Sequence, residues 1–494
     1  MLQLNNQDAG FVYHESNETP MHIAGIGIYA YLSNQEENLE QFITKFIQKR
    51  IHLLPELTQK YQQVPFNLDK PYWVQDKNFD LQFHIRHLAL AKPGNWQQLT
   101  EMISRLHAKP LDFKKPLWEI YIIEGLNEPN FGNKPCYALM FKIHHAIVDG
   151  IAAQGLFATL HDLTIDAAPP EPPAYNQNQE PQAAISGFSL LQKSLPQLIK
   201  RPIKQTTHFY QKAPKIIRGL YKSYQGELKS GTKLKVPQTQ FNQKLSSQRV
   251  FNGIEVSLDK IKAIKNTLNN GVTVNDVVLC IISGGLRHYL KQQDLLPAES
   301  LSAMIPQNIR HQAEESTYGN QVGGLFALIH SDINNPVARL LAIHESTDQA
   351  KYFSKALASE SIFKNYMGGF LTPTLGKQFN KWINHSGIKE FLGPFACNTL
   401  ISNVAGPQFP LFQGGAELKS FWGLPPLTHG IGLGHAVFSY NNNMTISFLS
   451  CKEMMLDPNN YTQCLLQSFN ELTESILAKK NDESVNNIDQ LKAG

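Results

Sequence analysis

A proline-dense stretch near residue 170 divides the chain. Between Ala167 and Gly187, asparagine and glutamine residues are interspersed with five prolines: Pro169, Pro170, Pro172, Pro173 and Pro181. Proline has no backbone N–H group to donate, so neither a helix interior nor a central strand tolerates this density. We therefore predict a linker between two folded parts.

The lengths on either side of this linker suit separate folded units. At roughly 150 residues per domain, 494 residues suit two or three domains. Apolar residues make up 42% and charged residues 17%, which is the usage of a globular protein. We predict four segments: an N-terminal lobe over residues 1–165, a proline-rich and then basic linker over 166–245, a C-terminal lobe over 246–480, and a polar tail over 481–494.

Strand-like and helix-like patterns alternate before the linker. Ile23, Ile26 and Ile28 lie in a strand-like stretch, and residues 137–143 form a strongly apolar one. A helix is predicted where apolar residues recur at helical spacing, at Leu39, Phe42, Ile43, Phe46 and Ile47.

The same mixed texture returns after the linker. Thr273 is a predicted N-cap for a helix whose apolar face carries Val278, Ile281, Ile282, Gly285 and Tyr289. Further strands are predicted at residues 254–258, 303–306, 322–329, 400–404 and 438–449, the last broken into a hairpin at Asn441-Asn442-Asn443. A last helix follows, with a frayed tail after Lys480. The chain should be a mixed α/β protein of two lobes with its site between them.

One segment of the chain is strongly basic. Residues 193–236 hold eleven Lys and Arg against one acid, Glu227, whereas the whole chain has a net charge of only +4. Apolar and aromatic residues are interleaved with these charges, which favours binding to an anionic membrane or lipid-droplet surface. The alternative is a solvated helical hairpin packed on the body. We do not expect nucleic-acid binding, because no recognised module accompanies the charge.

Cysteine usage and the N-terminal sequence indicate the cellular compartment in which the protein resides. The five cysteines are odd in number and form no CxxC pair, which fits a reducing compartment without disulfides. The N-terminus has no leader pattern, and the longest uncharged apolar run, residues 277–286, is about half of a membrane span. We expect a cytoplasmic protein, associated peripherally with the inner membrane or with lipid droplets.

The densest polar cluster in apolar surroundings is the ten-residue stretch 141–150, FKIHHAIVDG. Side chains alternate along a strand, so His145 should share a face with Ile143, whereas His144 should point the other way with Lys142. Burial favours a neutral imidazole, which can take a proton from an alcohol. His145 is therefore a candidate general base.

The two histidines have other interpretations. A histidine that merely completes the core is common, and a histidine pair can bind a metal. Histidines on opposite strand faces are poor joint ligands, and neither HExxH nor a Cys/His set is present, so we expect no metal. A GxSxG nucleophile elbow and a P-loop are also missing, which disfavours a serine hydrolase and a nucleotide-driven enzyme.

Four ordered motifs carry a resemblance to a known family. His144-His145-x-x-x-Asp149-Gly150 resembles the HHxxxDG signature of chloramphenicol acetyltransferase-like (CAT-like) acyltransferases. Residues 116–119 (PLWE), 274–279 (VNDVVL) and 401–407 (ISNVAGP) resemble segments of bacterial wax ester synthase/diacylglycerol acyltransferases. The similarity spans residues 8–475. Ala405 replaces a usual proline, and residues 307–309 depart from the usual small or aliphatic residues, which bears on substrate shape rather than on the base.

This resemblance implies a fold and a reaction. It implies two CAT-like lobes that enclose a tunnel, with acyl-CoA and a long-chain alcohol or diacylglycerol approaching from different sides. His145 would activate the hydroxyl for direct attack on the thioester, and Asn275, in the first turn of its helix, would face the oxyanion. Acyl-CoA would be a co-substrate, with no cofactor bound permanently and with CoA-contacting residues unknown.

Other residues of the motifs are expected to be structural. A carboxylate four residues beyond His145 is badly placed to orient that imidazole. The resemblance implies instead a structural ion pair between Asp149 and Arg310. His144, Gly150 and Asn403 are expected near the site in supporting roles.

Two alternatives remain at this level. A carrier-protein-dependent condensation-type acyltransferase would share His145 and Asp149, but not the combined context of the other motifs. A non-catalytic lipid-droplet or membrane protein could retain the fold, although the intact His145, Asn275 and Gly150 argue against it.

Overall fold

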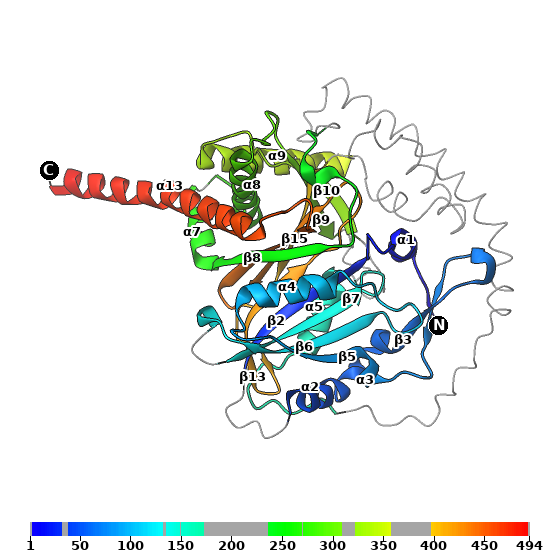
Figure 1. Cartoon of the computed structure of the whole chain (residues 1–494). Helices are drawn as coiled ribbons and strands as arrows, with labels where there is room; N and C mark the ends of the chain where they lie inside the picture. Colours follow the sequence, from blue (N-terminus) through cyan, green and yellow to red (C-terminus); the bar gives the residue numbers. More distant parts are fainter. Residues whose placement is uncertain are drawn as a thin grey trace.

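The computed structural model describes residues 2–31, 38–131, 135–148, 150–171, 236–268, 270–308, 322–356 and 397–492. Their strands form two six-stranded sheets and one three-stranded sheet. Figure 1 shows the two large sheets one above the other, with helices on their outer faces and α4 (Trp96–His107) between them. The predicted mixed α/β fold is confirmed.

The first large sheet has the spatial order β12-β13-β2-β7-β6-β5. β7 pairs antiparallel with both β2 and β6, and every residue in it except Phe141 is buried. Burial on both faces accounts for its nearly continuous apolar sequence. The strands are β2 (His22–Ala30), β5 (Ile85–Ala89), β6 (Trp118–Leu126), β7 (Cys136–His144), β12 (Phe412–Gln413) and β13 (Ala416–Leu424).

Different helices cover the two faces of this sheet. Tyr137 and Leu139 share a hydrophobic cluster with α2 (Leu39–Gln48) and α5 (Gly150–Thr159). Ala138 and Met140, on the opposite face, share one with α4. The alternation predicted along β7 is therefore confirmed within the strand, as is the helix predicted at residue 39.

The second large sheet has the order β10-β9-β11-β14-β15-β8. Its strands are β8 (Arg249–Ser257), β9 (Ser302–Asn308), β10 (Val322–Leu328), β11 (Thr399–Ala405), β14 (Leu433–Tyr440) and β15 (Asn443–Cys451). These include the strands predicted after the linker. Asn441 and Asn442 join β14 to β15 with φ of 44° and 66°, a left-handed turn that asparagine tolerates, so the predicted hairpin is confirmed.

A layer of helices accompanies the second sheet. It consists of α7 (Leu258–Leu268), α8 (Val274–Gln292), α9 (Pro336–Ala356) and α13 (Pro458–Lys492). The apolar face predicted for α8 is buried. A Cβ atom at Gly285 would lie 2.6 Å from Leu465 Cδ2, so only glycine permits this approach of α8 to α13. α13 continues to Lys492 and extends away from the body in Figure 1, whereas a frayed tail was predicted after Lys480.

The C-terminal part of the chain supplies two strands to the first sheet. β13 pairs antiparallel with β2, and β12 pairs with β13. Residues 246–480 were predicted as the C-terminal lobe, and two short segments of this range, β12 and β13, lie in the sheet that the N-terminal part forms. Local patterns predict a strand but not its partner, because pairing depends on contacts distant in sequence.

Side chains also join the two sheets across α4. Trp96 Nε1 donates to Asn252 Oδ1 in β8 at 2.9 Å, and its ring centroid lies 4.8 Å from that of Trp422 in β13. Arg249 at the start of β8 donates to the carbonyl oxygen of Glu18. The two lobes are thus tied by polar and aromatic contacts.

Smaller elements complete the described chain. They are α1 (Asn6–His14), α3 (Leu81–His84), a small sheet of β1 (Leu2–Gln3), β4 (Tyr72–Gln75) and β3 (Gln59–Gln62), and short 3-10 turns at Ile51–Leu53, Pro55–Thr58, Pro65–Asn67, Pro129–Phe131 and Gln240–Asn242. Within the ranges given above, no helix combines the length and the apolar character needed to cross a bilayer.

Candidate active site

The two histidines lie where β7 ends. His144 is the last residue of the strand, and His145 begins the turn that follows. The His145 ring stacks on Phe11 of α1, with centroids 4.2 Å apart and planes 11° apart. The alternation rule predicted that His145 would share a face with Ile143. That rule holds only inside a strand, and β7 ends one residue too early for it to apply.

His144 is enclosed by protein groups. It is fully buried, and its Nδ1 accepts a hydrogen bond of 3.1 Å from the backbone N–H of Ala146. Nδ1 is therefore the unprotonated nitrogen of a neutral ring, and Nε2 carries the proton. Nε2 lies 3.4 Å from Glu15 Oε2. Both ring nitrogens of His144 thus face groups of the chain itself.

The segment between α1 and β2 contacts the turn at residues 145–147, which we call the histidine turn. Asn5 caps α1 by accepting from the backbone N–H of Asp8. The carboxylate of Glu15, just beyond α1, accepts from the backbone N–H of Met21. The carbonyl oxygen of Met21 in turn accepts from the backbone N–H of His145 at 2.9 Å. A single carboxylate therefore links His144 to the backbone that holds His145.

A buried ion pair lies on the strand face that carries His144. Lys142 is fully buried, and its Nζ lies 3.1 Å from Glu119 Oε2. Nζ also donates to the carbonyl oxygens of Leu106 and Lys109, at 3.2 and 3.0 Å. Burial lowers the pKa of Lys142, and Glu119 acts in the opposite direction. Glu119 is the acid of the PLWE segment, so this motif supplies a structural partner.

Trp118, beside Glu119, packs in the core beneath the first large sheet. Its side chain is fully buried, and its Nε1 donates to the carbonyl oxygen of Leu57 at 2.6 Å. This contact satisfies the one polar atom of a ring that otherwise fills the cluster beneath the sheet.

Asn275 and Asn403 meet although 128 residues separate them. Thr273 caps α8 through a reciprocal pair of contacts with Asp276, as predicted, so Asn275 lies in the first turn. Asn403 in β11 donates through Nδ2 to Asn275 Oδ1 at 3.4 Å. This contact turns the carbonyl side of the Asn275 amide toward β11.

Asp276 anchors the beginning of α8 from below. It is fully buried and accepts from Thr347 Oγ1 at 2.8 Å and from His344 Nδ1 at 3.0 Å, both in α9. One neighbouring helix therefore holds the residue next to Asn275, and the first turn of α8 is tied to α9.

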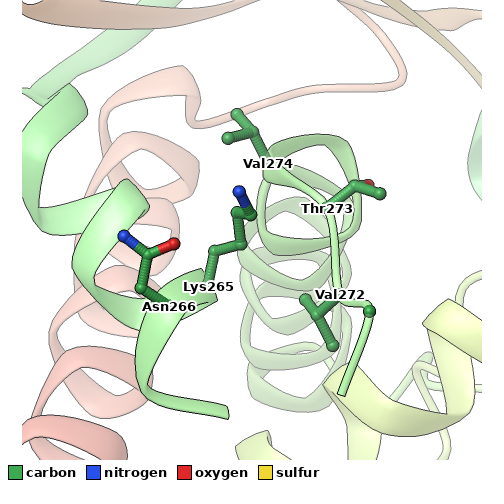
Figure 2. Close-up of a pocket in the computed structure, with 6 residues that line it drawn as sticks. Lys265, Asn266, Val272, Thr273 and Val274 are labelled. Carbon is green, nitrogen blue, oxygen red and sulfur yellow. The ribbon is translucent and has the colours of Figure 1, made fainter. Parts of the chain in front are cut away.

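A surface pocket of about 510 Å³ opens between the end of α7 and the beginning of α8. Figure 2 shows Lys265 rising from α7 between the two helices, with Val274 above it. Val274 is the residue before Asn275. The lining residues are Lys265, Asn266, Gly271, Val272, Thr273 and Val274. A basic side chain and the amide end of α8 give this pocket a positive character.

Two predicted residues cannot be placed. Asp149 and Arg310 lie outside the described residues, so their ion pair stays a prediction. Gly150, the last residue of the motif, begins α5. Among the residues described, no group of three or more His, Cys, Asp and Glu side chains could hold a metal ion.

Sequence reasoning did not identify three residues around the histidines. Phe11 and Glu15 come from a segment more than 120 residues away, and no local pattern links them to the motif. Glu119 could have been inferred, because Lys142 and His144 share a strand face and a buried lysine needs an acidic partner.

Comparison with known proteins is consistent with this arrangement. A family described as wax ester synthase/diacylglycerol acyltransferase catalytic domain matches residues 4–278, and the WS/DGAT C-terminal domain matches residues 318–473. The O-acyltransferase WSD of Acinetobacter baylyi is 29% identical, over 98% of this chain and 99% of that protein.

Solved structures share the fold. The wax ester synthase/diacylglycerol acyltransferase from Marinobacter aquaeolei VT8 is similar with a TM-score of 0.64 and 24% identity, over 96% of this chain and 99% of that one. The first condensation domain of the CDA synthetase is similar with a TM-score of 0.54 and 11% identity, over 96% and 95%. The catalytic-domain match covers more than half of the chain. The chain therefore belongs to the wax ester synthase/diacylglycerol acyltransferase family.

Proposed function

We propose that this O-acyltransferase moves a long-chain acyl group from acyl-CoA to the hydroxyl of a long-chain alcohol, giving a wax ester, or of diacylglycerol, giving triacylglycerol. The observation that carries the proposal is the histidine turn after β7, within a chain matched by this family along nearly its whole length. His144 is fully buried, with Nδ1 accepting from the Ala146 backbone and Nε2 facing Glu15, whereas His145 lies in the turn after the strand, which supports His145 as the base.

The proposed reaction is a direct transfer. His145 takes the proton of the hydroxyl while its oxygen attacks the thioester carbonyl carbon, and the carbonyl oxygen becomes an oxyanion. The oxyanion collapses, the bond from carbon to sulfur breaks, and the proton passes from the imidazolium to the CoA sulfur. The products are an ester and free CoA. No covalent intermediate with the enzyme is needed.

Asn275 is proposed to stabilise the oxyanion. Its position in the first turn of α8 supports this role, because unpaired backbone N–H groups and the helix dipole there favour negative charge. The bond from Asn403 occupies Asn275 Oδ1 and so directs the Nδ2 donor away from β11. A preorganised donor costs no reorientation when the negative charge develops.

Two further assignments concern support and approach. Asp149 and Arg310 are proposed to form a buried structural ion pair, and the two substrates to enter a tunnel between the lobes from different sides. The pocket beside Asn275 is proposed to receive phosphate groups of CoA, since Lys265 can offer them a positive charge.

The basic residues 193–236 are proposed to bring the enzyme to an anionic membrane or droplet surface, where its lipid substrates reside. Each of the ten net positive charges would contribute up to about 1 kcal/mol near such a surface. Sedimentation with phosphatidylglycerol vesicles at low and high salt tests this. Binding that survives replacement of Lys200, Arg201, Lys204, Lys212 and Lys215 by glutamine would contradict it.

A product assay tests the catalytic proposal. Purified protein is incubated with palmitoyl-CoA and either hexadecanol or dioleoylglycerol, and esters are quantified. His145→Ala should lower turnover by about 10² to 10⁴ while the protein remains folded. A folded His145→Ala protein with more than about half of wild-type turnover would show that His145 is not the general base. Transfer only from an acylated carrier protein would favour a condensation-type enzyme instead.

A further inference from the structure

We infer that Phe11 of α1 is a positioning residue that holds the plane of the His145 imidazole and favours its protonated form during the reaction. The inference rests on the proposed function, because it assigns Phe11 a role through the proposed base. It explains why a helix at the beginning of the chain packs against a turn more than 130 residues later.

The contact has the geometry of a parallel stack. The two ring centroids lie 4.2 Å apart, and the planes differ by 11°. Phe11 is only 8% exposed and belongs to a hydrophobic cluster with Val12, Met21 and Ala146. Since this packing fixes the phenyl ring, the imidazole that lies on it cannot tilt without separating from it.

The second histidine of the motif has a different aromatic neighbour. Phe113 meets the His144 ring edge-on, with centroids 5.5 Å apart and planes 77° apart. Among the described residues, Phe11 lies beside His145 and Phe113 beside His144, and of these two contacts the one at His145 is the face-to-face stack. This difference supplies a matched control.

A stack suits a base that must also carry charge. It covers a face of the imidazole, whereas a hydroxyl would approach a nitrogen at the edge of the ring. When His145 takes the proton, the imidazolium lies over the negative face of the phenyl ring and is attracted to it. The attraction is stronger for the charged ring than for the neutral one, so it should raise kcat rather than lower KM.

Steady-state kinetics of full-length variants test the inference. Wild type, Phe11→Leu, Phe11→Tyr and Phe113→Leu are assayed with palmitoyl-CoA and hexadecanol, and each melting temperature is measured. Phe11→Leu should lower kcat by about tenfold and change both KM values by less than about twofold. Phe11→Tyr keeps an aromatic ring and should stay within about threefold of wild-type kcat.

Phe113→Leu removes a ring from the same cluster and should keep kcat within about threefold of wild type. The inference is wrong if Phe11→Leu keeps wild-type kcat, if Phe113→Leu is equally slow, or if Phe11→Tyr is as slow as Phe11→Leu. Phe11→Met replaces Phe11→Leu if the latter does not fold. An inactive wild type would contradict the proposed function itself, whereas an active wild type with an equally active Phe11→Leu contradicts only this inference.

Discussion

Two adjacent histidines have unlike surroundings at the end of β7. His144 lies within the fold and contacts Glu15 and the Ala146 backbone, while His145 sits in a turn against Phe11. The pair therefore divides into a residue held inside the fold and the residue that we propose as the base. Neither role is visible in the letters HH, because both follow from contacts with α1 and the segment after it.

The amide pair of Asn403 and Asn275 offers a test at the same scale. Asn403→Asp replaces the donor that binds Asn275 Oδ1 with an acceptor. The Asn275 amide should then turn its Nδ2 toward β11 and away from the oxyanion. Loss of one such donor costs about 3 to 4 kcal/mol, or about 10²- to 10³-fold in kcat; a donor that is misdirected and not removed should cost part of this, about 10- to 100-fold.

KM for acyl-CoA and the melting temperature should change little in Asn403→Asp, since the side chain is exposed. Steady-state assays and thermal unfolding check both. Asn403→Ala, which removes the donor without adding an acceptor, should lose less activity. An Asn403→Asp enzyme with wild-type kcat would show that Asn403 does not orient Asn275.

Pairs of elements are joined by buried polar contacts as well as by apolar packing. His435 in β14 accepts or donates at both nitrogens, to Thr399 Oγ1 in β11 at 3.0 Å and to Tyr461 Oη in α13 at 2.8 Å. The contacts fix where α13 crosses the second sheet. They also leave an imidazole with no access to water.

This contact between sheet and helix predicts a dependence of stability on pH. Burial lowers the pKa of His435 from 6.5 to about 3. Between these values the unfolded chain binds a proton that the folded protein does not, so stability should fall as the pH falls, by about 1.4 kcal/mol per pH unit. His161, whose pKa is lowered to about 4 by burial, acts in the same direction.

His435→Gln should weaken the dependence of the free energy of unfolding on pH, because the unfolded variant has one fewer histidine to protonate. Urea unfolding of both proteins at about pH 7, 6 and 5 gives the free energies of unfolding to compare. The variant should be less stable than wild type at neutral pH, and the difference between them should narrow toward pH 5. A constant difference would mean that His435 takes up its proton in the folded protein.

The two halves of the molecule are joined by strands that the C-terminal part contributes to the N-terminal sheet. β13, from the C-terminal part, pairs with β2, and Trp422 on β13 lies against Trp96 on α4. β2 would be an edge strand without β13, and edge strands tend to aggregate. The N-terminal sheet is thus complete only when the rest of the chain has been added.

Separate expression of the halves tests this dependence. Residues 1–200 and 201–494 divide the chain beyond the described part of the N-terminal lobe. The first fragment alone should be insoluble, because it lacks β13, whereas the two fragments expressed together should copurify. A soluble, monomeric 1–200 fragment with a cooperative unfolding transition would contradict the role assigned to β13.

Local patterns in the sequence predicted most of the helices and strands. The helical spacing of Leu39, Ile43 and Phe46 predicted α2, and the asparagines at 441 and 442 predicted a hairpin, because period and turn chemistry are local properties. Four motifs, each a short run of neighbouring residues, carried the resemblance to the family.

Only the tertiary structure decided what surrounds those motifs. Phe11 stacks on His145, Glu15 reaches His144, and Asn403 meets Asn275 across more than a hundred residues. β13 joins a sheet whose other strands, apart from its short neighbour β12, come from the first third of the chain. These contacts arise when distant segments bury their apolar faces together, and a single sequence carries no record of which faces meet.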